Sequence, residues 1–369
     1  MAIEFAERIR RIPVYPVAAG YDLGDDVAML ASNESPFGPL PAVVEAAQRA
    51  VAGVNRYPDP SYAGLRNALA DRYGVPPGRI ALGNGSCDIL LAAGEALLEP
   101  GAEVVYAWPA FSVYPHLAAA SGARPIEVPL DAEERHDLDA MATEVTVATR
   151  LVLICNPNNP TSTALPLEQI EALLERVPRH VCVILDEAYC EFALSLGDPF
   201  ASLDLLRRWP NLVLLRTFSK VYGLAGLRVG YALCGDERFR EAVDQVRQPF
   251  HLGAVAQAAA VEALKHQDAV EDRVTRTIAN RLALEEGIRG LGLWLADSEA
   301  NFVWVRLPAP DDADRARVAS EEAAITRGLA ERGVLVRAGN SLGRAGALRV
   351  TVGTGAENAR FVAAMAELL

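Results

Sequence analysis

Residues 151–161 read LVLICNPNNPT, an unbroken apolar run that passes directly into asparagines and prolines. A short, continuous apolar run predicts a strand buried on both faces, as in a parallel sheet between two layers of helices. The same kind of run recurs at residues 79–82, 103–106, 181–185, 212–215 and 229–233. Helical patterns such as residues 86–98 and 167–177 lie between the runs. This alternation predicts an α/β fold whose sheet is mostly parallel.

The pattern changes after about residue 249. Long helical stretches at residues 254–264 and 272–288 precede candidate strands at residues 301–307, 333–337 and 348–352, which predicts a smaller α+β unit. The chain ends in a predicted helix, because Thr354 and Glu357 have the spacing at which each side chain caps the other's backbone amide. We therefore expect a large domain over residues 40–245 and a small domain formed by residues 1–39 with residues 246–369.

The composition excludes several classes of protein. With 51% hydrophobic, 22% charged and 7% aromatic residues, the 369-residue chain is neither disordered nor collagen-like. Its formal charge of −13 and the lack of a run of Lys or Arg argue against a nucleic-acid partner. An anionic ligand must then be held by a few placed arginines and backbone amides.

The cysteines and the apolar segments bear on the cellular compartment. Five cysteines without a C-x-x-C pair predict reduced thiols rather than a disulfide framework. No apolar stretch approaches the roughly 20 residues of a membrane span, and charges interrupt residues 1–15, where a signal peptide needs an apolar core. We expect a cytoplasmic protein without a membrane partner.

Several common motifs are missing from the sequence. Neither a G-x-G-x-x-G after the first strand nor a P-loop is present, and the five histidines lie too far apart for a metal site, so no metal is expected. Residues 339–343 read GNSLG and match the nucleophile elbow of serine hydrolases. A strand candidate follows this motif and no histidine lies beyond Ser341, so a glycine-rich turn between two strands is the better interpretation.

Polar residues follow three of the predicted strands. Residues 156–161 read NPNNPT, residues 186–189 read DEAY, and residues 217–220 read TFSK. In open α/β sheets ligands bind at the carboxyl ends of strands, so these segments predict one shared site. Lys220 and Lys265 are the only lysines, which indicates that position 220 needs an amine. An internal ion pair of Asp186 with Lys220, formed for structural reasons alone, is the alternative interpretation.

These motifs, with Arg228 eight residues after Lys220, resemble those of the fold-type I, pyridoxal-phosphate-dependent aminotransferases of class I and II. Within that family the chain is most similar to histidinol-phosphate aminotransferase, in segments that run from about residue 30 to 354. The segments are NESPFG at residues 33–38, RYP at 56–58, GNGS at 83–86, RTFSK at 216–220, GLAGLR at 223–228 and LRVTVGT at 348–354. Aromatic-amino-acid aminotransferases share most of them.

The resemblance implies the fold-type I architecture and pyridoxal 5′-phosphate as the cofactor. Lys220 would be the Schiff-base lysine and the proton carrier, tasks that suit an amine with a lowered pKa. Asp186 would face the pyridine nitrogen and keep it protonated. Asn159 and Tyr189 would hydrogen-bond the phenolic oxygen of the cofactor, and Phe111 would stack on its ring. Lys220, Asp186 and Tyr189 are thus the implied catalytic residues.

The resemblance also places the phosphate of the cofactor. The residues implied to hold it are Gly85, Ser86, Cys87, Thr217, Ser219 and Arg228. The helix predicted over residues 86–98 begins there, and its first backbone amides and its dipole favour an anion. Tyr57 would reach this phosphate from the neighbouring subunit, so a homodimer with shared active sites is implied.

The implied substrate-binding residues are Tyr15, Asn33, Arg337 and Arg349. Arg349 would bind a carboxylate as a planar fork. The implied reaction is amino transfer between histidinol phosphate and 2-oxoglutarate or glutamate, a step of histidine biosynthesis, by a ping-pong mechanism. The chief alternative is an aromatic-amino-acid aminotransferase acting on phenylalanine or tyrosine. A second, less favoured alternative is a pyridoxal-phosphate-dependent decarboxylase of a phosphorylated amino acid.

Two residues depart from the pattern of the family. Ser162 stands where the family usually has Gly, and a serine there disfavours a positive-φ turn. Cys87 stands where the family usually has an acidic residue, although the backbone amide of position 87 survives the change. We expect cofactor binding to persist with an altered local geometry.

Overall fold

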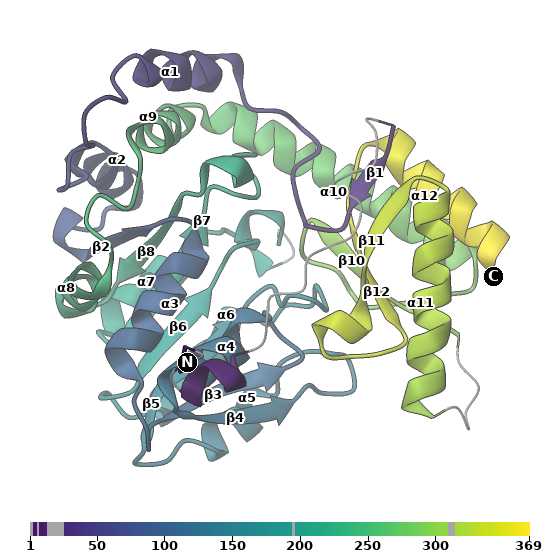
Figure 1. The fold of residues 1–369 in the computed structure, drawn as a ribbon, viewed down its shortest axis with the longest axis horizontal. Coiled ribbons are helices and arrows are strands. Elements are labelled where there is room, and N and C mark those ends of the chain that lie inside the picture. The colour runs from purple at the N-terminus through teal and green to yellow at the C-terminus, as the bar shows by residue number, and fades with distance from the viewer. Residues whose placement is uncertain (1–2, 6, 13–25, 194–195, 309–313) are drawn as a thin grey trace.

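Two β-sheets, each covered by helices, form the core of the protein (Figure 1). The computed structural model describes residues 3–5, 7–12, 26–193, 196–308 and 314–369. The larger sheet has the strand order β2-β8-β7-β6-β5-β3-β4, and the smaller has the order β1-β11-β12-β10-β9. The α/β layer and the smaller α+β unit predicted from the sequence are both present.

The large sheet contains all six strands predicted from apolar runs. Its strands are β2 (Ile80–Gly83), β3 (Glu103–Trp108), β4 (Arg124–Pro129), β5 (Thr149–Cys155), β6 (Cys182–Asp186), β7 (Leu212–Thr217) and β8 (Gly230–Cys234). No apolar run predicts β4, whose prolines are tolerated because it is an edge strand paired only with β3. Strand β8 runs antiparallel to both neighbours, so the sheet is mostly parallel rather than wholly so.

Helices cover both faces of the large sheet, which explains the continuous apolar runs. One core cluster joins Leu151 and Leu153 to α3 (Ser86–Leu97), α4 (Val113–Ser121) and α8 (Glu237–Val246). A second joins Val152 and Ile154 to the helices of the opposite face. Those helices are α1 (Pro41–Val51), α2 (Ala63–Tyr73), α5 (Leu138–Thr143), α6 (Leu167–Arg176), α7 (Ser202–Arg208) and α9 (Ala254–Ala263). Successive residues of β5 thus point to opposite helical layers.

The small sheet carries the carboxyl-terminal part of the chain together with one strand from near the amino terminus. Its strands are β1 (Ala28–Leu30), β9 (Trp294–Leu295), β10 (Phe302–Arg306), β11 (Val334–Ala338) and β12 (Ala347–Thr351). Helices α11 (Arg315–Glu331) and α12 (Gly355–Leu368) pack on it. The predicted capping box of Thr354 and Glu357 opens α12, and residues 339–342 form the predicted turn between β11 and β12.

Helix α10 (Gln267–Gly290) joins the two units. Its Val270 and Val274 belong to the core of the large sheet, whereas Leu284 and Ile288 belong to the core of the small sheet. Helix α9 packs on α1 and α2 and belongs to the core of the large sheet. The domain boundaries at residues 39/40 and 245/246 stay a prediction. Within the described residues, no helix has both the length and the apolar character needed to cross a membrane.

Glu134 fastens the large unit to the small sheet. It lies in the loop after β4, is fully buried and has a φ of 64°. Its carboxylate accepts hydrogen bonds from Trp304 Nε1 at 3.1 Å and Arg306 Nε at 2.8 Å, and Arg344 Nη2 lies 3.3 Å away. Its backbone carbonyl accepts from Thr163 Oγ1 at 2.7 Å. Glu134 therefore connects both units, through three neighbours of its carboxylate and one of its backbone carbonyl.

Replacing this carboxylate should weaken the fold. We predict that Glu134→Gln lowers the free energy of unfolding by about 2–3 kcal/mol, somewhat less than is usual for breaking a fully buried pair. The discount reflects the side chains of Arg306 and Arg344, which are 36% and 40% exposed. Urea denaturation followed by circular dichroism measures the change.

Glu45→Gln is the matched control for this measurement. Glu45 pairs with Arg49 on the surface of α1, where both side chains are 67% exposed, so its loss should cost no more than about 1 kcal/mol. Equal destabilisation by the two variants would contradict the assigned role of Glu134.

Candidate functional site

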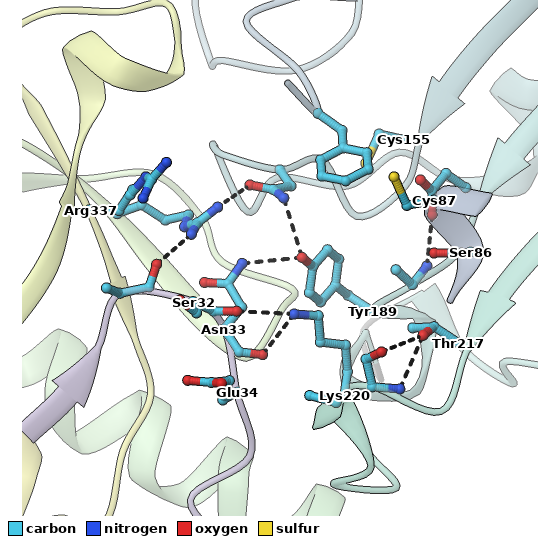
Figure 2. A pocket seen from close by; sticks show the side chains of 18 of the residues that line it. Ser32, Asn33, Glu34, Ser86, Cys87, Cys155, Tyr189, Thr217, Lys220 and Arg337 are labelled. Atoms are coloured by element: carbon cyan, nitrogen blue, oxygen red, sulfur yellow. Dashed lines mark hydrogen bonds between the residues drawn. The ribbon is translucent and has the colours of Figure 1, made fainter. Parts of the chain in front are cut away.

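A cavity of about 350 Å³ opens at the carboxyl ends of β5, β6 and β7, on the side that faces the small sheet. Of the residues predicted for the site, those that line it are Asn33, Ser86, Cys87, Phe111, Asn159, Asp186, Tyr189, Thr217, Ser219, Lys220, Arg228, Arg337 and Arg349. The three polar segments that follow the strands thus meet in one place, as Figure 2 shows for Tyr189, Thr217 and Lys220. Gly85 lies directly behind this lining, in contact with Arg228.

Among the described residues, Tyr57 is the other predicted site residue, besides Gly85, that is not part of this lining. Tyr57 lies beyond α1 with 81% of its surface exposed, and its ring stacks on Phe250 with 4.5 Å between the ring centroids. The single chain therefore does not bring Tyr57 into its own cavity. Tyr15 lies outside the described residues.

Lys220 follows β7, and its amine points across the cavity to the segment after β1. Its Nζ donates hydrogen bonds to the backbone carbonyls of Ser32 at 3.1 Å and Asn33 at 3.0 Å. Desolvation lowers the pKa of Lys220 to about 7, and the positive charge of Arg349 acts in the same direction. An amine with this pKa is partly neutral near neutral pH, so it can act both as a nucleophile and as a base.

Asp186 ends β6 and is almost completely buried. Its Oδ1 accepts from the backbone amide of Ala188 at 3.2 Å, and its Oδ2 accepts from the Tyr114 hydroxyl at 3.3 Å. Burial raises the pKa of Asp186 to about 7, while these two hydrogen bonds and the charge of Lys220 act in the opposite direction. Because Asp186 and Lys220 each bond to other groups, a purely structural ion pair does not account for them.

A hydrogen-bond chain runs from Tyr189 to Arg349. The phenolic oxygen of Tyr189 accepts from Asn33 Nδ2 at 3.1 Å and from Asn159 Nδ2 at 3.3 Å. Asn159 Oδ1 accepts in turn from Arg349 Nη1 at 2.7 Å, and Arg349 Nη2 donates to the carbonyl of Ala31 at 2.6 Å. Burial raises the pKa of Tyr189 well above its usual range, so this residue stays a neutral phenol. The chain fixes the orientation of all four polar side chains.

The start of α3 forms a cradle for an anion. Gly85 precedes the helix with a φ of 80°, and a Cβ at this position would collide with the Arg228 guanidinium. Arg228 Nη1 donates to Ser219 Oγ at 3.3 Å, and Thr217 Oγ1 donates to Ser219 Oγ at 2.9 Å. A helix amino terminus, two hydroxyls and a guanidinium together suit a phosphate group.

The two departures from the family pattern have different outcomes. Ser162 does adopt the left-handed conformation, with a φ of 62°, and its amide donates to the carbonyl of Asn158 at 2.8 Å. The turn is therefore kept, at a backbone cost of roughly 1–3 kcal/mol. Cys87 lines the cavity, and burial raises the pKa of its thiol to about 11, so it contributes no charge.

Arg337 and Arg349 form a cationic wall on the small-sheet side of the cavity. Figure 2 labels Arg337 in this wall. They are register partners on β11 and β12, so their side chains leave the sheet side by side. Only 8% of Arg337 and 7% of Arg349 is exposed. Two guanidinium groups that line one cavity offer several N–H donors and two positive charges, so this wall suits a carboxylate or a phosphate.

Some contacts within the site carried no signal in the sequence. Ser32 and Asn33 bind Lys220 through backbone carbonyls, which every residue possesses. Tyr114 bonds to Asp186 across 72 positions of the chain, and its place in an apolar helix is typical of a core residue. Only the three-dimensional arrangement reveals these contacts.

Comparison with known proteins identifies the family of this chain. Residues 25–365 match the family model described as aminotransferase class I and II. The aromatic amino acid aminotransferase of Thermobifida fusca is 47% identical over 312 residues, covering 85% of this chain and 86% of the relative. Histidinol-phosphate aminotransferase 1 of Cupriavidus pinatubonensis is 42% identical over 358 residues, covering 97% and 92% of the two chains.

A solved structure is similar over the whole chain. The crystal structure of histidinol-phosphate aminotransferase from Sinorhizobium meliloti in complex with pyridoxal 5′-phosphate has a TM-score of 0.85 at 30% identity. The similarity covers 100% of this chain and 98% of that one.

The two lysines allow a direct test of the site. We predict that pyridoxal 5′-phosphate followed by borohydride labels Lys220 and leaves Lys265 largely unlabelled, as read by peptide mass spectrometry. Labelling of Lys220 should rise as the pH increases through about 7, because the amine becomes neutral there. Lys265 is paired with Glu262 on the surface and has no anion cradle beside it. Labelling of the two lysines to the same extent would contradict the assignment.

Proposed function

Because this chain belongs to the class I and II aminotransferases, whose cofactor is pyridoxal phosphate, we propose that it transfers an amino group between histidinol phosphate and 2-oxoglutarate by a ping-pong mechanism. The observation that carries this proposal is the pair of adjacent, nearly buried arginines, Arg337 and Arg349, that faces the cavity opposite Lys220. Histidinol phosphate offers a phosphate and 2-oxoglutarate offers carboxylates, so one cationic wall serves both substrates.

The residues present fit the cofactor. The cradle of α3 with Thr217, Ser219 and Arg228 would hold the phosphate, and Phe111 would pack on the ring. Asp186 would face the ring nitrogen, and Asn159 and Tyr189 would donate to the phenolic oxygen. When bound, the cofactor supplies an electron sink for the carbanion formed at the substrate Cα.

Lys220 would move the proton in this reaction. Its pKa of about 7 leaves a substantial neutral fraction at neutral pH, so its amine can take the proton from the substrate Cα and return it at a neighbouring atom. Asp186 would hold a positive charge at the ring nitrogen through its carboxylate. Arg349, fixed by Asn159 and the carbonyl of Ala31, would orient the anionic end of the substrate.

An aromatic-amino-acid aminotransferase is the second candidate. It is supported by the Thermobifida fusca relative, whose identity to this chain exceeds that of the Cupriavidus pinatubonensis relative. In this case Arg349 would bind the α-carboxylate of phenylalanine or tyrosine, and Arg337 would contribute less to the binding of the amino donor.

Kinetics with matched amino donors separate the two candidates. We predict that histidinol phosphate exceeds phenylalanine, tyrosine and unphosphorylated histidinol in kcat/KM, with 2-oxoglutarate as the acceptor. The loss of a charge-assisted contact is worth about 1.5–3 kcal/mol, so histidinol should react at least roughly tenfold more slowly. A clear preference for phenylalanine would instead support the aromatic candidate and leave the chemistry of Lys220 unchanged.

Arg337→Ala tests the same proposal from the side of the protein. The variant should reduce the difference in kcat/KM between histidinol phosphate and histidinol, because it lacks one of the two guanidinium groups proposed to bind the phosphate. Arg317→Ala is the control, since Arg317 lies on the surface of α11 with 57% of its side chain exposed and pairs with Glu321. An unchanged gap in Arg337→Ala would exclude Arg337 from phosphate recognition.

We also propose that the active protein is a homodimer with shared sites, and that Tyr57 acts in the cavity of the partner subunit. Tyr57 is exposed, its ring stacks on Phe250, which is 37% exposed, and the nearby residues Val51 and Val54 are 54% and 59% exposed. Covering such apolar side chains with a second copy would lower the free energy. The proposed compartment is the cytoplasm, because all five cysteines are free thiols.

Subunit mixing tests the shared site. We predict that mixing Lys220→Ala with Tyr57→Phe restores activity, because each hybrid dimer then contains one site with both wild-type residues. Random exchange should recover about a quarter of the wild-type sites. The test requires that Tyr57→Phe alone be measurably impaired. If the mixture shows only the activity of its separate components, Tyr57 acts within its own subunit or not at all.

A further inference from the structure

Tyr114 connects two residues on the inner side of the cavity. It lies in the first turn of α4 and is fully buried. Its hydroxyl donates to Asp186 Oδ2 at 3.3 Å, and its backbone amide donates to the carbonyl of Phe111 at 2.9 Å. The rings of Tyr114 and Phe111 meet edge to face, with 5.8 Å between centroids and 85° between planes. One residue thus contacts both the buried carboxylate and the aromatic wall.

We propose that Tyr114 is a positioning residue for amino transfer, which fixes the rotation of the Asp186 carboxylate and keeps it ionised. The proposal rests on the role proposed above for Asp186. Ala188 donates to Asp186 from the same strand end, whereas Tyr114 reaches the carboxylate from a separate helix. The two donors hold different oxygens, so together they set the plane of the carboxylate.

The surroundings of Asp186 make this hydrogen bond matter. The titratable groups that act on or near the carboxylate are Cys87, Tyr114, Cys155, Glu187, Tyr189 and Lys220. Burial and the charge of Glu187 raise the pKa of Asp186, whereas Lys220 and the hydrogen bonds from Ala188 and Tyr114 lower it. Loss of the Tyr114 hydroxyl must therefore raise this pKa further, and more of Asp186 is then protonated near neutral pH.

A protonated Asp186 cannot supply the negative charge expected of it. The stabilising charge is present above the pKa of the carboxyl group and is lost as the pH falls through it. Removing the Tyr114 hydroxyl moves that loss to a higher pH. At a given neutral pH, the variant should bind pyridoxal phosphate more weakly and turn over more slowly than the wild type.

Tyr114→Phe tests the proposal, with Tyr106→Phe as the matched control. Tyr106 is also fully buried and its hydroxyl also donates to a carboxylate, Glu127 Oε1 at 3.0 Å, but that carboxylate lies outside the cavity lining. The readouts are the dissociation constant of pyridoxal phosphate from the apoprotein between pH 6 and 9, the absorption of the bound cofactor over the same range, and the pH profile of kcat/KM.

In Tyr114→Phe we expect the acid limbs of all three profiles to move to higher pH by about half to one unit. At a pH below the midpoint, this shift corresponds to a roughly threefold to tenfold weaker affinity for pyridoxal phosphate. Tyr106→Phe should leave these profiles at their wild-type positions. Identical profiles in the two variants would overturn the role of Tyr114.

Asp186→Asn separates this inference from the proposed function. If that variant keeps wild-type affinity, absorption and turnover, the proposed role of Asp186 fails. If it is impaired while Tyr114→Phe matches Tyr106→Phe, only the inference about Tyr114 fails. In the Asp186→Asn background, Tyr114→Phe should cause no further pH shift, because the group it acts on is gone. An equal shift in that background would show that Tyr114 acts by another route.

Discussion

Lys220 and Asp186 place two ionisable groups in the interior, at the carboxyl end of the large sheet. Desolvation moves the pKa of Lys220 down and that of Asp186 up, each to about 7. A charge buried without partners is costly, so the surrounding chain must supply dipoles and hydrogen bonds. The amine of Lys220 donates hydrogen bonds to the backbone carbonyls of Ser32 and Asn33. The carboxylate of Asp186 accepts hydrogen bonds from the Tyr114 hydroxyl and from a backbone amide. The cavity is built from those donors and acceptors.

The small sheet completes the cavity on the side opposite the large sheet. Strand β1 pairs with β11, and this pairing delivers the segment after β1 to the amine of Lys220. The neighbouring strand β12 contributes Thr351, whose hydroxyl accepts from the Asn33 amide at 2.8 Å. Asn33 itself has a φ of 53°, a conformation that few non-glycine residues hold without such support. The hydrogen bonds from Trp304 and Arg306 to the Glu134 carboxylate hold the two units together.

Sequence reasoning succeeded wherever one strand or helix carries the signal. Continuous apolar runs located six strands because both faces of the large sheet are covered, as the opposite packing of Leu151 and Val152 shows. It missed β4, whose prolines are allowed only by its edge position, and it missed Tyr114, whose partner is distant in the chain. Ser162 kept a left-handed turn that its type disfavours. Such features depend on tertiary contacts that no local pattern contains.

In the proposed function, anion recognition and proton transfer are linked within this cavity. The chain carries a net charge of −13, yet Arg228, Arg337 and Arg349 all face the cavity. Arg349 and Arg228 both lower the pKa of Lys220, so the groups that attract an anion also keep the amine partly neutral. In the proposed function, an anionic substrate end bound at Arg349 would offset that positive charge and make the amine a stronger base. The base would therefore be strongest when a substrate is bound.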